Sequence, residues 1–147
     1  LPWLGKIWGM HFMGSIRAVL VVVIVSLLTA CGGTSEQMAA FQDGIPLVNV
    51  IREPSGKETV LTGTIKPKIN FTSTYTSQSD DGIKCSGKFS NRGVGFMNCS
   101  NGWKMALTIP KDKYGTVNGS YVETADGIGV ATGWGKEANA DLLRAKM

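Results

Sequence analysis

Histidine is almost absent from this 147-residue chain, which has His11 alone. Residues 31–147 contain none, so that part cannot form a Ser-His-Asp triad, a Cys-His dyad or the usual zinc site. The scattered Asp residues fall in predicted turns, where Asp bonds its own backbone. We therefore predict no catalytic residue, no metal site and no cofactor, and expect a protein that is not an enzyme.

A dense basic cluster is also missing. The net charge is +4, but residues 1–30 contribute Lys6 and Arg17 and no acid. Residues 31–147 then hold 13 basic and 11 acidic residues, a net charge of +2. We expect no nucleic-acid binding from such a balance. Seven lysines form either a solvated surface or a contact for anionic cell-wall polymer or lipid headgroups: Lys66, Lys68, Lys84, Lys88, Lys104, Lys111 and Lys113.

No apolar run is long enough to span a membrane, which takes about 20 residues. The longest such run covers 11 residues, 18–28, and only Ser26 in it is polar. Arg17 precedes the run, and Met13 is the favoured start codon. The run has the length of a signal-peptide core, while an uncleaved anchor helix or a buried helix is the alternative.

The end of the run, Leu28-Thr29-Ala30-Cys31, resembles the lipobox of bacterial lipoproteins. The resemblance implies that residues 1–30, an upstream extension plus a signal peptide, are removed. It also implies that Cys31 is acylated and holds the protein on a membrane. Gly32 rather than Asp follows this Cys, which by the same resemblance indicates the outer membrane, at its periplasmic face. Two cysteines then remain, too few for a Cys-only metal site.

The rest of the chain divides into a tether and one domain. Residues 31–45 are small and polar and predict a flexible tether, with a short helix over 35–41 as an alternative. From residue 46 to 147 apolar residues recur with a period of two, and Gly, Asn and Asp punctuate at short intervals. We predict a single all-β domain, an antiparallel meander closing into a barrel or a small sandwich, with a short C-terminal helix. The predicted strands are 47–52, 58–65, 68–76, 82–89, 94–100, 103–109, 114–124 and 127–134.

Hairpin counting predicts a disulfide between Cys85 and Cys99. The loop 91–93 ends in Gly and pairs Ser90 with Val94. Counting outward places the two cysteines opposite each other at a non-hydrogen-bonded position, where side chains lie closest. An oxidising compartment would let the bridge form, and closing a loop of about 15 residues is worth roughly 3 kcal/mol.

A two-residue turn at Asn101-Gly102 is expected to bring Trp103 beside Ser100 and Lys104 beside Cys99. The following strand then presents one apolar face, onto which its neighbour adds two residues. This predicted stripe comprises Trp103, Met105, Leu107, Ile109, Val94 and Phe96. Trp103 and Trp134 are candidate ligand contacts, since a Trp at a strand end or between two glycines can leave a ring face open; a core role is the alternative.

The segment 62–138 also resembles known families through its glycine rhythm. Gly93-Val94-Gly95 and Gly127-Ile128-Gly129 are similar to the hairpin starts of MORN-type repeats, and the Cys85–Cys99 pattern resembles that of small proteobacterial lipoproteins. These resemblances imply a fold and a location and no catalytic residue. We expect a lipid-anchored envelope lipoprotein with a structural or interaction role, whose partner is an envelope protein or a cell-wall glycan. A periplasmic glycan-binding or inhibitor module is the alternative, and a small hydrolase comes third.

Overall fold

The computed structural model describes residues 35–147. The predicted signal peptide, the predicted start at Met13 and the predicted acylation site Cys31 with its motif lie outside the described residues. Within the described part, no helix combines the length and the apolar character needed to cross a bilayer.

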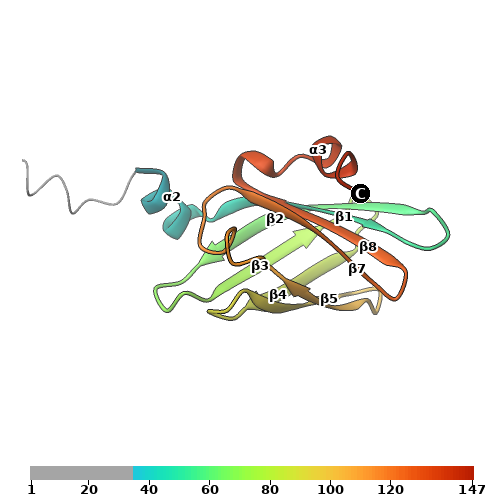
Figure 1. Cartoon of the computed structure of the whole chain (residues 1–147), viewed down its shortest axis with the longest axis horizontal. Coiled ribbons are helices and arrows are strands. Elements are labelled where there is room, and N and C mark those ends of the chain that lie inside the picture. Colours follow the sequence, from blue (N-terminus) through green and yellow to red (C-terminus); the bar gives the residue numbers. More distant parts are fainter. Residues whose placement is uncertain (1–34) are drawn as a thin grey trace, which may run out of the picture. The chain divides into compact units, whose positions relative to one another are not determined.

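Eight antiparallel strands form one sheet in the order β6-β5-β4-β3-β2-β1-β8-β7. The sheet curls until its edge strands β6 and β7 approach each other, which gives a nearly closed barrel (Figure 1). The predicted all-β fold is confirmed, as a barrel-like meander rather than a sandwich. The strands are β1 (Ile45–Arg52), β2 (Glu58–Pro67), β3 (Ser73–Gln78), β4 (Lys84–Phe89), β5 (Val94–Cys99), β6 (Lys104–Thr108), β7 (Gly119–Ala125) and β8 (Ile128–Trp134).

Within residues 35–147, three helical segments accompany the barrel. Helix α2 (Ser35–Asp43) leads into β1, within the segment for which a tether or a short helix was expected. A 3-10 turn, η1 (Gly135–Glu137), and helix α3 (Ala140–Arg144) follow β8. The helical residues of the C-terminal segment therefore form the predicted short helix.

Two ends of the barrel differ in their loops. The end next to α2, here called the α2 end, carries the loops 68–72, 90–93 and 109–118. The opposite end, here called the far end, carries the loops 53–57, 79–83, 100–103 and 126–127. Short turns close the far end, while the longest loop of the barrel, 109–118, lies at the α2 end. Figure 1 shows α2 and the β2–β3 loop at one end and the β1–β2 hairpin at the other.

Four hairpins share one type of three-residue turn, in which the last loop residue is Gly in the left-handed region. In the β4–β5 hairpin, Ser90 N donates to Val94 O and Gly93 N to Ser90 O. A side chain is unfavourable in this conformation, which explains the glycines. The four are Gly56, Gly82, Gly93 and Gly102, with φ of 83°, 88°, 77° and 92°.

The turn between β5 and β6 corrects the predicted register. Cys99 N donates to Trp103 O, so the loop holds three residues, 100–102, and not two. A slip of one residue moves every side chain of a strand to the other face. Phe96 therefore pairs with Ala106 and not Leu107, and it points outward with Val94 rather than joining the core stripe. Lys104 pairs with Asn98 rather than lying beside Cys99.

The disulfide prediction is confirmed by the β4–β5 pairing. Cys85 lies directly opposite Cys99, with Phe89 opposite Gly95 and Gly87 opposite Met97. The two Cα atoms are 4.0 Å apart and the sulfur atoms 2.00 Å apart. Each large side chain in this hairpin covers a glycine, so packing supports the same register as the bridge.

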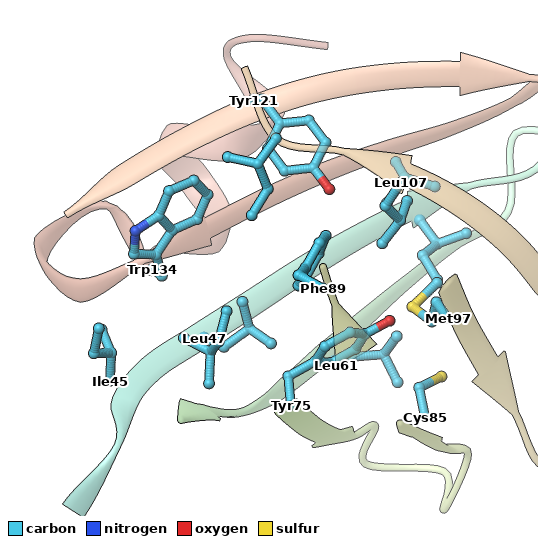
Figure 2. Close-up of a cluster of buried hydrophobic side chains, with 14 of the residues drawn as sticks. Ile45, Leu47, Leu61, Tyr75, Cys85, Phe89, Met97, Leu107, Tyr121 and Trp134 are labelled. Carbon is cyan, nitrogen blue, oxygen red and sulfur yellow. The ribbon is translucent and has the colours of Figure 1, made fainter. Parts of the chain in front are cut away.

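The barrel interior holds the main hydrophobic core. Alternate residues of every strand point inward, as period-two patterning requires. Figure 2 shows the resulting cluster, in which Phe89 and Tyr75 from one wall face Trp134 and Tyr121 from the other. Among its fully buried members are Ile51, Leu61, Met97 and Leu107.

A second, smaller cluster lies outside the barrel under α3. Val48 and Val50 of β1 and Ala131 of β8 point outward, and Leu143 of α3 packs on them with no exposed surface. Asn139 caps the helix, because its side-chain oxygen accepts bonds from the backbone N–H groups of Asp141 and Leu142. This cover explains why β1 is buried on both faces.

Candidate binding pocket at the α2 end

A cavity of about 330 Å³ opens at the α2 end of the barrel. Its wall comes from α2, the start of β1, the end of β2, the loops 68–72 and 109–118, and the end of β8. Most of the lining is apolar, and two lysines stand among it, Lys68 and Lys113. The principal apolar residues are Phe41, Ile45, Ile65, Phe71, Val117 and Trp134. Concave, mostly apolar sites with a few polar groups are the usual form of a ligand pocket.

Trp134 lines this cavity, and its neighbours hold it in place. It is 3% exposed, and its Nε1 donates to Thr116 O at 3.0 Å. Gly119 lies directly across from it on β7, where a Cβ would come within 2.4 Å of Trp134 Cζ2. The missing side chain at 119 therefore makes the space that the indole fills, and Trp134 is among the residues that line the cavity.

Trp103, the other predicted contact, is at the opposite end of the barrel. It directly follows the 100–102 turn, is partly buried and packs against the main core. The structure therefore does not bring Trp103 and Trp134 together. Neither residue is an exposed aromatic platform, although Trp134 does contribute to the cavity wall.

Tyr114 organises the loops around the cavity. Its hydroxyl lies within hydrogen-bonding distance of two carbonyl oxygens, Ser90 O at 2.7 Å and Phe71 O. One proton serves one acceptor at a time, so Tyr114 links the 109–118 loop to both neighbouring loops. Burial raises the pKa of the Tyr114 phenol above its ordinary value of 10.0.

Sequence reasoning missed two loops of the site. Residues 114–118 belong to a predicted strand, but the structure starts β7 at Gly119. Residues 68–72 also belong to a predicted strand, whereas the structure starts β3 at Ser73. Lys68 N donates to Thr72 O and Phe71 N to Lys68 O, which closes a three-residue loop. Asn70 Oδ1 accepts from Thr72 N, and this Asn was the one signal in the sequence for a turn.

The seven predicted lysines separate into two groups. Lys66, Lys68, Lys111 and Lys113 lie at the α2 end, on or beside its loops. Lys84, Lys88 and Lys104 share the outward face of β4–β6, because the corrected register places Lys104 beside Asn98. Of the first group, Lys68 and Lys113 line the cavity, and no lysine of the second group does.

A polar network crosses the barrel interior beyond the cavity. Asn49 is 1% exposed, accepts from Thr132 Oγ1 at 2.9 Å and donates to Ser77 Oγ at 3.3 Å. Tyr121 lies beside Thr132, and its buried hydroxyl has no hydrogen-bond partner among residues 35–147. Burial raises the pKa of Tyr121. These groups are neutral and spread over several strands, so they give the interior polarity without a charge.

The described region holds no cluster of potential metal ligands. No three His, Cys, Asp or Glu residues of 35–147 come close enough to hold a metal ion together. Asp80 and Asp81 lie in the β3–β4 turn, Asp126 in the β7–β8 turn and Asp112 in the 109–118 loop. The cavity offers shape, apolar surface and two cations, which suits binding of an apolar group with an acidic end.

Comparison with known proteins gives no relative from which to carry over a role: no protein-family model, curated protein or solved structure matches the chain.

Proposed function

We propose that this protein is a lipid-anchored cell-envelope protein with a non-enzymatic interaction role. The observation that carries the proposal is the motif Leu28-Thr29-Ala30-Cys31 after an 11-residue apolar run, immediately before a disulfide-bridged β domain. A disulfide persists in oxidising compartments and is rare in the cytosol. The anchor and the bridge therefore agree on an extracytoplasmic location, with the outer membrane as the proposed address.

Acylation supplies membrane affinity by partition. Each buried methylene contributes about 0.8 kcal/mol, so one chain binds weakly and two or three bind durably. Such an anchor needs no transmembrane helix and leaves the surface of the barrel beyond the anchored end free to bind a partner.

The decisive experiment compares Cys31→Ser with the wild type, each expressed as the full chain in a bacterial host. We expect the wild type to incorporate an alkyne-bearing fatty acid and to sediment with membranes. The Cys31→Ser variant should take up no label and should lose the mass of the acyl groups. The matched control is Thr34→Ala, which leaves the motif intact and should behave like the wild type. An isolated wild-type protein with residues 1–30 still attached and an unmodified Cys31 would overturn the proposal.

Glycan binding is the second candidate, and one observation favours it: Trp134 lines a cavity together with Lys68 and Lys113. Sedimentation with purified peptidoglycan tests it. The pair Trp134→Phe and Trp103→Phe separates a pocket role from a general loss of aromatic surface, because these residues lie at opposite ends of the barrel. If the pocket binds glycan, Trp134→Phe should weaken sedimentation of the protein with peptidoglycan and Trp103→Phe should not.

A further inference from the structure

Exposed apolar side chains gather at the α2 end. Met38 and Phe41 of α2 are 58% and 52% exposed, and Ile69 and Phe71 of the β2–β3 loop are 91% and 75% exposed. Single exposed apolar residues are normal on protein surfaces. These four belong to two neighbouring elements that together wall the cavity, and a gathering of this kind marks an interaction surface.

Phe71 has an unfavourable backbone conformation at this surface. Its loop has the hydrogen-bond pattern of the glycine-ended hairpins, and Phe71 occupies the position that Gly56 holds in the β1–β2 turn. Its φ is 59°, in the left-handed region that bulky residues avoid. The ring is three-quarters exposed, so packing inside the protein does not account for this conformation. Strained residues of this kind concentrate at functional surfaces.

The loop charges of the barrel are polarised from end to end. The loops of the α2 end carry four bases and one acid: Lys68, Arg92, Lys111, Lys113 and Asp112. The loops of the far end carry four acids and one base: Glu53, Asp80, Asp81, Asp126 and Lys57. Helix α2 adds Glu36 and Asp43, which reduces the excess at its end without reversing it. Basic residues around apolar side chains suit an anionic lipid surface.

The sequence also limits how far this end can lie from the bilayer, if Cys31 is acylated as proposed above. Four peptide units separate Cys31 from Ser35, the first residue of α2. Even fully extended, they span at most about 14 Å. A lipid on Cys31 therefore keeps α2 and the loops beside it close to the membrane.

From these observations we propose that the α2 end is a membrane-contact surface. Ile69 and Phe71 enter the interfacial region of the bilayer, Met38 and Phe41 lie along it, and Lys68 and Lys113 contact anionic headgroups. The acylated Cys31 then acts as one point of attachment and the β2–β3 loop as a second. Two points fix the orientation of the barrel and present its far end to the periplasm.

A fluorophore at Ile69 tests this orientation. The acylated protein uses Cys31 in a thioether and Cys85 and Cys99 in a disulfide, so an introduced cysteine is the one free thiol. Ile69→Cys carries the label at the proposed contact, and Asp80→Cys carries it on an exposed turn at the far end. Both full-length proteins are produced lipidated, labelled with a nitrobenzoxadiazole group and reconstituted in vesicles of phosphatidylethanolamine and phosphatidylglycerol. Brominated lipids then report whether each label enters the bilayer.

We expect blue-shifted emission and quenching for the label at 69, and neither for the label at 80. Replacing phosphatidylglycerol by phosphatidylcholine should diminish the quenching at 69. Equal quenching of this label in the two kinds of vesicle would overturn the role of the lysines. Mass spectrometry of the same samples reads the anchor independently. An acylated Cys31 with labels at 69 and 80 equally unquenched would overturn the contact surface and leave the anchor standing. A bare Cys31 would overturn the anchor, and with it the premise of the orientation.

Discussion

Thr132 donates a hydrogen bond to Asn49 inside the barrel, 2.9 Å from hydroxyl to amide oxygen, across the β1–β8 pair. The Asn49 amide continues to Ser77 on β3, so three strands share one polar connection. A buried polar group is costly when it loses its partner, because water cannot replace the bond.

Asn49→Leu should therefore lower the free energy of unfolding by about 2 kcal/mol, although leucine has a similar volume. The substitution leaves the hydroxyls of Ser77 and Thr132 without Asn49 in a dry interior. Urea unfolding followed by tryptophan fluorescence measures the loss. Thr62→Val is the control, since Thr62 is exposed on β2 and its replacement should change stability by no more than about 0.5 kcal/mol. A leucine variant as stable as the wild type would show that the network contributes nothing.

Phe71→Gly and Phe71→Ala separate backbone strain from side-chain loss. Both remove the ring, but alanine keeps the Cβ that disfavours a φ of 59°. We expect the glycine variant to be more stable than the alanine variant by about 1 kcal/mol. Thermal unfolding of the two proteins under identical conditions checks the difference. Equal stability would mean that the loop adopts another conformation in solution.

Glu58 joins α3 to the barrel and makes stability depend on pH. Arg144 Nε lies 2.7 Å from one carboxylate oxygen, and Arg52 Nη2 lies 3.3 Å from the other. The hydrogen bond from Arg144, with a smaller contribution from Arg52, lowers the pKa of Glu58 below its ordinary 4.5. A carboxyl with a lowered pKa stabilises the folded state above its unfolded pKa and loses that effect as the pH falls through the folded value.

The wild type should thus be more stable than Glu58→Gln at neutral pH, and the difference should shrink as the pH drops below about 4.5. Urea titrations across this pH range measure it. Glu53→Gln removes a carboxylate from the neighbouring turn and serves as the charge control. A difference between wild type and Glu58→Gln that persists unchanged into acid would assign the effect to packing instead of charge.

The double variant Cys85→Ala with Cys99→Ala should lose roughly 3 kcal/mol of unfolding free energy, because the bridge closes a loop of about 15 residues. A reducing agent should destabilise the wild type by a similar amount and leave the double variant unchanged. The wild type under reducing conditions controls for the change in side chains. Indifference of the wild type to reduction would show that the bridge is dispensable.

Counting residues outward from a turn gave the correct strand register where the sequence showed how long the turn was. Asn91-Arg92-Gly93 ends in a left-handed glycine, and the count from it placed Cys85 opposite Cys99. The same counting failed one hairpin later, where Asn101-Gly102 has the composition of a two-residue turn. There Ser100 N donates to Lys84 O and the Ser100 hydroxyl accepts from Lys84 N, so Ser100 pairs with β4 and joins the loop toward β6. The pairing of Ser100 with Lys84 depends on a neighbouring strand, so the composition of residues 100–102 does not predict it.

The pocket was harder to predict from the sequence than the fold. Alternation and turn residues indicated all eight strands, because burial of one face imposes that pattern locally. The cavity depends on loops meeting from distant parts of the chain, as Tyr114 shows by reaching Ser90 and Phe71. Ile69 and Phe71 also look like strand residues, since apolar side chains usually point to a core.

The incomplete closure of the barrel gives it a place to open. The bond from Thr108 N to Glu123 Oε2 bridges β6 and β7, and no backbone ladder joins these two strands within residues 35–147. Amide protons on the two seam strands should therefore exchange with deuterium earlier than those of β1, which is paired on both sides. Thermal breathing of the barrel would start by separation of β6 from β7, while the cluster under α3 stays packed.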